Sequence, residues 1–178
     1  MWEVFKKEIR SFLGSFIAYI VMGVFLAITG LFMWIIKGNN VLDLGIASLQ
    51  VMFNIAPYIL IFLVSAITMR SLSEEKRLGT IEILTTRPVS DTSILLGKYL
   101  AAVALIVFTL LPTLFYFYTI QQLADPLQGT DTGATIGSYF GLILLAASYA
   151  SIGMFASSLT DNQIVSLIIS MVLCFFWY

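Results

Sequence analysis

The sequence has no histidine, a single cysteine (Cys174) and few charged residues. The absence of histidine removes the commonest general base and the commonest metal ligand. A lone cysteine excludes an intrachain disulfide, and because Cys174 lies in an apolar run we interpret it as core packing. No GxxxxGK[ST] run is present, so we do not expect this chain to bind ATP. The absences together predict no catalytic residue, no metal site and no cofactor on this chain.

The scarcity of charge also defines the class of protein. Charged residues make up 11% of the chain and hydrophobic residues 60%, and the mean hydropathy is +0.98. A soluble domain carries about 25% charged residues, so this chain cannot cover itself with polar surface. Several apolar runs are long enough to cross a hydrocarbon core of ~30 Å as helices. The sequence therefore predicts an all-α, polytopic transmembrane bundle, a single membrane domain over residues 1–178.

Five membrane spans are predicted, separated by polar, Gly and Pro residues. Pro57 should kink the second span or mark its first turn, and Pro112 should kink the third. Ser90 is a candidate N-cap for the third span, and residues 41–54 suit a surface helix leading into the second. The last run has 15 residues against the ~20 needed to cross, which favours a truncated chain over a half-inserted helix. The predicted spans cover residues 12–36, 53–69, 93–120, 138–159 and 164–178.

Polar and small residues inside these spans have simple interpretations. Ser and Thr in membrane helices more often bond their own backbone or a neighbouring helix than a substrate. The fourth span is rich in Gly, Ala and Ser, which let helix backbones approach closely in lipid. We expect this small-residue surface to pack within the chain, with a dimer interface as the alternative.

The basic residues divide unequally between the two sides of this topology. All nine except Lys37 lie on the side of the N-terminus and the loop 70–92. The positive-inside rule then places the N-terminus and this loop in the cytoplasm, and the Gln121–Gly137 loop outside. Lys98, one to two turns into the third span, is expected to extend toward the cytoplasmic headgroups.

The first eleven residues have the pattern of an amphipathic helix. Apolar side chains recur at helical spacing, and basic side chains lie between them. This pattern is typical of a helix in the membrane interface whose cations lie among lipid headgroups. The alternative is the juxtamembrane start of the first span. The residues that carry the pattern are Trp2, Phe5, Lys6, Lys7, Ile9 and Arg10.

The most polar internal stretch is RSLSEEKRLGTIEILTTRPVSD, residues 70–91. Leu78, Ile81 and Leu84 recur at three-residue spacing, which predicts a short amphipathic helix. Gly79 can end the cytoplasmic extension of the second span, and Thr80 can cap the new helix. Such a helix, fixed to two spans, is suited to docking on a soluble motor. An ordinary solvated loop is the alternative.

Part of this loop resembles a known family. The run EEKRLGTIEILTTRP is similar to the segment E-x-x-x-G-T-[IL]-E-x-L-x-x-x-P of type-2 ABC exporter permeases. The likeness extends to the opening KKEIRSFLGSFIAYI and to FASSLTDNQIVS (Phe155–Ser166). It is greatest to the gliding-motility-associated permease subunit of Bacteroidetes. The residues at matching positions are Glu75, Gly79, Thr80, Ile81, Glu82, Leu84 and Pro88.

The resemblance implies a permease subunit of an ABC transporter in the bacterial cytoplasmic (inner) membrane. Family members have six spans, and two permeases pair with two nucleotide-binding subunits, which bind ATP and Mg. This chain itself would not be an enzyme, and its export function would serve gliding motility or associated secretion. Residues 1–10 would form an interfacial connecting helix that also touches the ATPase. The ATPase-coupling residues would be Glu74, Glu75, Lys76, Arg77, Gly79, Thr80, Ile81, Glu82, Leu84, Arg87 and Pro88.

Three other functions were compared with that of an ABC permease. An ion-coupled secondary transporter needs ionisable residues near mid-membrane, and the predicted spans place no Asp, Glu, Arg or His there. A membrane-embedded enzyme would lack any nucleophile–base pair or metal site in the bilayer. The main alternative is a structural anchor subunit of a larger motility or secretion complex, without transport of its own. Lipid, an ATPase and a second permease are the expected partners, and nucleic acid is not.

Overall fold

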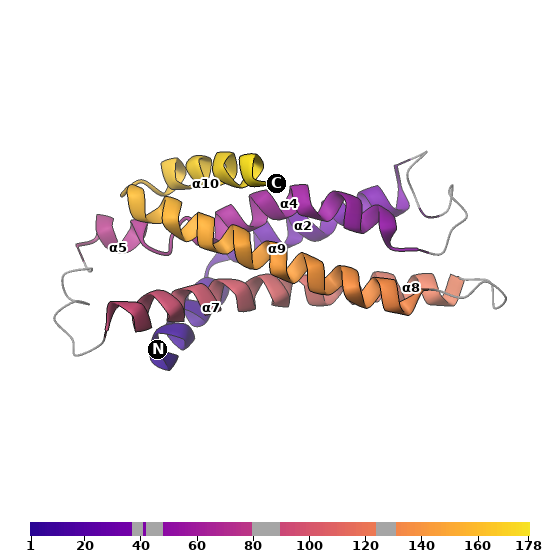
Figure 1. Ribbon diagram of the computed structural model, residues 1–178, viewed down its shortest axis with the longest axis horizontal. Helices are drawn as coiled ribbons and strands as arrows, with labels where there is room; N and C mark the ends of the chain where they lie inside the picture. Colours follow the sequence, from indigo (N-terminus) through magenta and orange to yellow (C-terminus); the bar gives the residue numbers. More distant parts are fainter. Residues whose placement is uncertain (37–40, 42–47, 80–89, 124–130) are drawn as a thin grey trace.

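The computed structural model describes residues 1–36, 41, 48–79, 90–123 and 131–178. These residues are almost entirely helical and include no strand. The long helices run side by side along the longest axis of the molecule (Figure 1). Four of them are long and apolar enough to cross a membrane. The predicted all-α, multi-pass membrane architecture is confirmed at this level.

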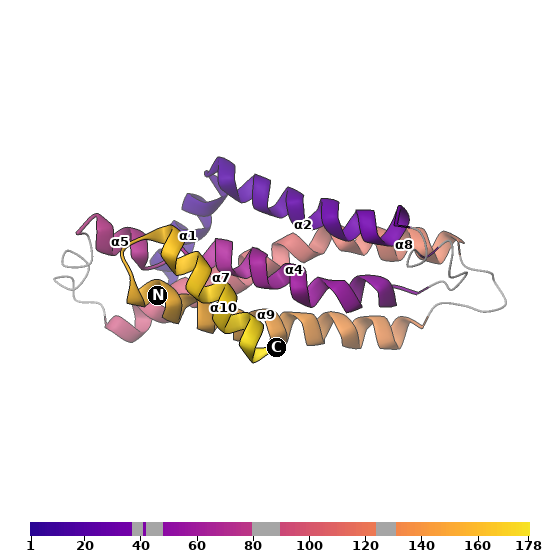
Figure 2. The ribbon, with the colours of Figure 1, turned by 90° about the horizontal axis from the view of Figure 1, so that it is seen from above.

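The N-terminal segment forms a helix of its own, α1 (Trp2–Leu13), followed by the first long helix, α2 (Phe16–Trp34). The two are separated by an elbow at Gly14 and Ser15, where α1 turns away from α2 (Figure 2). The elbow is closed by backbone bonds from Gly14 N–H to Arg10 O (2.9 Å) and from Ser15 N–H to Phe12 O (2.9 Å). The first span therefore begins four residues later than predicted.

The central helix is α4 (Gln50–Thr68), which contacts α2, α7, α9 and α10. It has the largest buried share of the four long helices, because its apolar residues surround the whole helix. Pro57 lies inside the helix and not in its first turn. A turn at Met69–Leu72 then leads to the short helix α5 (Ser73–Arg77).

The third long element is interrupted at Pro112. It consists of α7 (Asp91–Leu110), a 3-10 turn η1 (Leu111–Thr113) and α8 (Leu114–Leu123). Proline has no N–H to donate to the preceding turn, which accounts for the change of helix type. Ser90 is at the N-cap position as predicted, but its hydroxyl pairs with Ser93 Oγ (2.9 Å) and makes no capping bond.

The fourth long helix, α9 (Thr132–Leu159), starts six residues before its predicted start. Asp131 supplies the reason: its Oδ1 accepts the Ala134 N–H (2.9 Å) and caps the helix N-terminus. The last helix, α10 (Gln163–Trp177), is capped in the same way by Asn162, whose Oδ1 accepts the Ile164 N–H (2.9 Å). It has 15 residues and packs on α9 and α4.

The small residues of α9 pack within the chain, as expected. Ala146 and Ala150 are buried, and Gly153 lies against Thr68 of α4 and Ser170 of α10. Gly141 differs from them, because no neighbouring atom lies within 4 Å of the position its Cβ would take.

Hydroxyl groups in the long helices mostly bond their own backbone, as predicted. Thr29 Oγ1 donates to Phe25 O (2.8 Å), and Thr109 Oγ1 donates to Leu105 O (2.9 Å). Ser65 is different, since its hydroxyl pairs with that of Ser170 (2.8 Å) and joins α4 to α10.

Candidate functional site

Three elements from distant parts of the sequence meet at one end of the bundle. They are α1, α5 and the first turns of α7 (Figure 1). All three lie in regions that the distribution of basic residues assigns to the cytoplasmic side. The structure thus brings the predicted interfacial helix beside the start of the predicted coupling loop.

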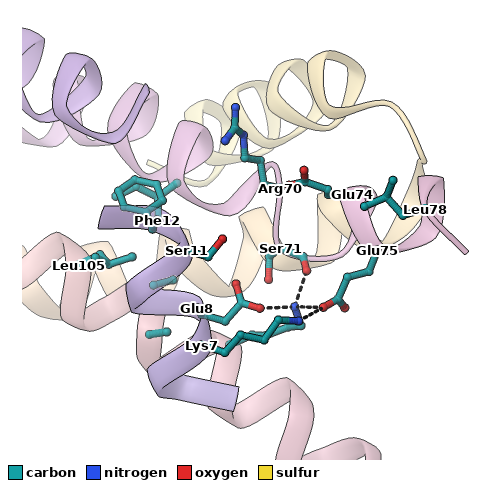
Figure 3. A pocket seen from close by; sticks show the side chains of 14 residues that line it. Lys7, Glu8, Ser11, Phe12, Arg70, Ser71, Glu74, Glu75, Leu78 and Leu105 are labelled. Carbon is teal, nitrogen blue, oxygen red and sulfur yellow. Dashed lines mark hydrogen bonds and ion pairs between the residues drawn. The ribbon is translucent and has the colours of Figure 1, made fainter. Parts of the chain in front are cut away.

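Lys98 of α7 is at the centre of this site, and Figure 3 shows Glu8, Ser71 and Glu75, which surround its ammonium group. Its Nζ lies 2.7 Å from Glu8 Oε1, 2.9 Å from Glu75 Oε1 and 2.8 Å from the Ser71 carbonyl oxygen. An ammonium group has three donors, and three acceptors from α1, the α4–α5 turn and α5 meet them here. We call Lys98, Glu8, Glu75 and Ser71 O the Lys98 cluster.

The prediction that Lys98 extends to the headgroups is wrong. Its side chain is 1% exposed, because Glu8 and Glu75 provide inside the protein the charge that lipid phosphate or water would otherwise supply. Glu75 also lies 3.5 Å from Lys7 Nζ, whose side chain is 64% exposed. Two lysines and two glutamates therefore balance in charge, and the balance makes the burial of Lys98 possible.

Close approach of α1 to α7 depends on Gly97, the residue before Lys98. A Cβ at this position would lie 3.0 Å from Met1 O and 3.2 Å from Val4 Cβ. Because glycine has no Cβ, the backbones can come near enough for Glu8 to reach Lys98. Glu8 shares the inward side of α1 with Val4 and Phe12, which are partly buried. An acid at helical spacing with apolar residues was the signal that could have identified Glu8 from sequence.

Ser157 of α9 holds the beginning of α5. Its Oγ accepts the N–H groups of Leu72 (3.0 Å) and Ser73 (3.0 Å), and it donates to Met69 O (3.1 Å). No side chain of α5 caps the helix, so Ser157 satisfies two backbone donors from outside. Sequence reasoning missed this role, because the two segments lie far apart in the chain.

Replacing Ser157 by Ala should destabilise the α5 start. The buried Ser73 N–H and the part-buried Leu72 N–H would lose their acceptor, at a cost of ~1–3 kcal/mol. We expect a lower thermal midpoint in lipid nanodiscs and faster hydrogen exchange of the Leu72 and Ser73 amides. Ser158→Ala is the matched control, because its hydroxyl is exposed and bonds only Phe155 O of its own helix (2.7 Å). Equal exchange rates in the two variants would contradict the capping role.

A cavity of ≈ 360 Å³ adjoins the Lys98 cluster. Arg70, Glu74 and Glu75 lie on its polar side, and Phe12 and Leu105 are among its apolar lining (Figure 3). Arg70 Nη1 donates to Ser15 Oγ (3.2 Å) at the elbow between α1 and α2. Its Nε is buried without a hydrogen-bond partner among the described residues.

Comparison with known families identifies the class of protein. Residues 42–178, well over half of the chain, match the family model described as ABC-2 family transporter protein. The chain belongs to the ABC-2 transporter family. No curated protein and no solved structure matches it. Family membership makes this chain a permease subunit of an ABC transporter and implies a partner ATPase subunit.

The described part of the predicted coupling region has an inward and an outward side. Glu75 is turned inward to Lys98, and Glu74 lines the cavity. Lys76 Nζ donates to Ser158 O of α9 while most of its side chain is exposed. Arg77, Leu78 and Gly79 are exposed. The remaining predicted coupling residues, Thr80, Ile81, Glu82, Leu84, Arg87 and Pro88, lie outside the residues that the structure describes.

Gly79 lies in the turn that follows α5; the sequence predicted a break here, but in a continuous extension of the second span, which instead ends at Thr68. The φ of Gly79 is +66°, in the left-handed region that favours glycine, and its N–H bonds to Lys76 O (3.1 Å). Leu78, directly before it, is 62% exposed. An exposed leucine next to a fixed backbone turn is available for contact with another surface.

The predicted amphipathic pattern of α1 is largely confirmed. Phe5 and Ile9 are partly buried, whereas Lys6, Lys7 and Arg10 are exposed. Trp2 departs from the pattern, because it is 59% exposed. Its ring stacks on Phe5 with centroids 5.1 Å apart, and Lys6 Nζ lies 5.4 Å from the Trp2 ring. Placement of α1 in the membrane interface stays a prediction.

Proposed function

We propose that this ABC-2 permease couples ATP hydrolysis on a separate nucleotide-binding subunit to export of a substrate across the bacterial cytoplasmic (inner) membrane. ATP and Mg would bind the partner, so this chain would not itself be an enzyme. The observation that carries the proposal is the two-sided α5. Its inner side is fixed to α1 and α7 through Glu75, and its end at Leu78 and Gly79 is exposed.

The distribution of charge supports docking of the ATPase at the end of the bundle that carries α1 and α5. Lys6, Lys7 and Arg10 of α1 are exposed at the same end of the bundle as Lys76 and Arg77 of α5. The positive-inside rule assigns that end to the cytoplasm, where an ATPase and ATP are found. The same cations suit anionic lipid headgroups beside the docked ATPase.

A complete transporter would need a second permease subunit, identical to this chain or related to it. The sequence likeness to gliding-motility permeases supports a role in gliding or associated secretion. Ion coupling is disfavoured, because Asp91 and Lys98 are the charged residues in the described parts of the four long helices. Asp91 is at the helix start, and Lys98 lies at the same end of the bundle.

Site-directed crosslinking tests the proposed dock. Single cysteines would replace Leu78, Thr80 or Thr85 in a full-length Cys174→Ser background, expressed with the ATPase encoded for the same transporter. We expect a crosslink to that ATPase, identified by mass spectrometry, whose yield changes when ATP is added. Leu123→Cys is the control, because Leu123 is 61% exposed at the opposite end of the bundle.

The alternative function, a structural anchor subunit, predicts a different crosslinking result. An anchor would insert correctly and copurify with motility or secretion components, yet none of the three cysteines would capture an ATPase in any nucleotide state. That outcome would reject coupling through this loop.

A further inference from the structure

We propose that Lys98 is a positioning residue that makes α1, α5 and the start of α7 move as one unit. A displacement of the loop after α5 would then reach α1 and the third long element together. This inference rests on the proposed function for the source of the movement. The existence of the unit itself depends only on the Lys98 cluster.

The unit has two arms, α1 and α5, and each is bonded separately to Lys98 of α7. Glu8 Oε1 (2.7 Å) connects α1 to Lys98, and Glu75 Oε1 (2.9 Å) connects α5 to it. The Ser71 carbonyl (2.8 Å) adds the turn that joins α4 to α5. Charge-assisted hydrogen bonds of this kind are roughly twice as strong as neutral ones.

Burial makes these bonds difficult to exchange for water. The Lys98 side chain is 1% exposed, and those of Glu8 and Glu75 are 24% and 13% exposed. If α5 moved away from α7, the ammonium would lose Glu75 and keep Glu8, in a cavity wall that includes Ala101, Ala102 and Leu105. Removing one partner from a buried ion cluster is strongly unfavourable. The low-energy movement is therefore one in which α5 and α7 stay together.

The contacts of α5 with α9 are of a different kind. Ser157 accepts two backbone N–H groups, and Lys76 donates to the Ser158 carbonyl from an exposed position. Neither contact pairs two full charges, and the Lys76 ammonium is open to water, which weakens its bond. We infer that relative motion, when it occurs, takes place between α5 and α9 and not between α5 and α7.

The burial of an ion cluster is by itself weak evidence that the cluster stabilises the fold. Replacing all its charges by neutral groups of similar shape is often neutral or stabilising, whereas removing one partner is destabilising. The triple variant Lys98→Met/Glu8→Gln/Glu75→Gln uses this difference. It should fold with nearly unchanged thermal stability and lose the rigid connection.

Distances between spin labels in lipid nanodiscs test the unit directly. One label pair joins α5 to α7, at Arg77 and Leu95, and a second joins α5 to α9, at Arg77 and Leu159. All three positions are exposed, and the background is Cys174→Ser. In the native cluster we expect a narrow α5–α7 distribution that is the same in apo and vanadate-trapped complexes. The α5–α9 distance should shift between these states.

The triple variant should broaden the α5–α7 distribution and reduce the nucleotide-dependent shift. The single variant Lys98→Arg keeps the positive charge and its hydrogen-bond donors. Its α5–α7 distribution should be as narrow as that of the native cluster. A change of the α5–α7 distance with nucleotide in the native cluster would overturn the proposal. So would an unchanged narrow distribution in the triple variant.

The double variant Glu8→Gln/Lys7→Gln supplies an arm-specific second test, because it removes both ion pairs of α1 and keeps the Lys98–Glu75 pair. A label pair at Lys6 and Leu95 should broaden in this variant while the Arg77–Leu95 pair stays narrow. Broadening of both pairs, or of neither, would contradict separate arms. The nucleotide-free distributions of the native, triple and arm-specific variants can be measured on the permease without the ATPase. Failure to bind any ATPase would reject the proposed function. The spin-label distances would still show whether α1, α5 and the start of α7 form one unit.

Discussion

Replacing Gly153 by alanine should loosen the contact of α9 with both α4 and α10. A Cβ there would lie 2.9 Å from Thr68 Cβ and 3.1 Å from Ser170 Oγ, and it would also overlap Thr68 Oγ1. Thr68 cannot turn aside easily, because its side chain is β-branched and its Oγ1 donates to Val64 O (2.9 Å). Overpacking of this kind typically costs ~1–3 kcal/mol. We expect a lower thermal midpoint and weaker protection of α10 from hydrogen exchange.

Gly141 of the same helix is the matched control. No neighbouring atom lies within 4 Å of its Cβ position, so Gly141→Ala meets no clash. An alanine in a helix interior is favoured over glycine by ~0.8–1.0 kcal/mol, so this variant should equal or exceed the parent in stability. Opposite signs for the two substitutions would confirm that Gly153 is a packing glycine. A Gly153→Ala variant as stable as Gly141→Ala would contradict it.

Helix positions were predictable wherever the sequence contains its own local signals. Apolar runs located the long helices, Pro112 located the interruption of the third, and Gly79 located the turn that follows α5. Boundaries were less accurate where a cap was overlooked. Asp131 starts α9 six residues early because its side chain binds the Ala134 N–H, although an aspartate before a helical run is a recognisable cap.

The central feature of the site was not predictable from local patterns. Lys98 near the start of a span ordinarily extends to the interface, and here α1 provides Glu8 and α5 provides Glu75 instead. Which segments meet at one end of the bundle depends on tertiary packing, including the approach that Gly97 permits. Ser157 is a similar case, because its partners lie in the α4–α5 turn and at the start of α5.

The family was indicated by a motif, whereas the site is defined by contacts. The G-T-[IL]-E segment identified an ABC exporter permease, and the match of residues 42–178 bears out the ABC-2 family. Its acids Glu74, Glu75 and Glu82 were all interpreted as ATPase-coupling residues. The structure places Glu75 against Lys98, so this acid contributes to the position of the loop from inside the permease.

Gly79→Val should weaken coupling to the ATPase without affecting membrane insertion. Gly79 has a φ of +66° and open space around its Cβ position, so the conformation of the backbone alone determines the effect. Left-handed backbone costs an L-residue ~1–2 kcal/mol, which is about a five- to thirtyfold change in an equilibrium. If docking requires the turn after α5, permease-stimulated ATPase activity should fall by a comparable factor at limiting permease concentration.

Gly79→Asn separates backbone strain from the mere loss of glycine. Asparagine adopts the left-handed region more readily than other L-residues, so this variant should retain most of the stimulated activity while adding a side chain as large as valine. Both variants should reach the membrane at the parental level, because Gly79 is exposed and makes no packing contact within 4 Å of its Cβ position. If valine and asparagine reduce stimulation equally, a side chain at this position blocks the dock directly. If neither does, the turn after α5 is not part of the coupling path.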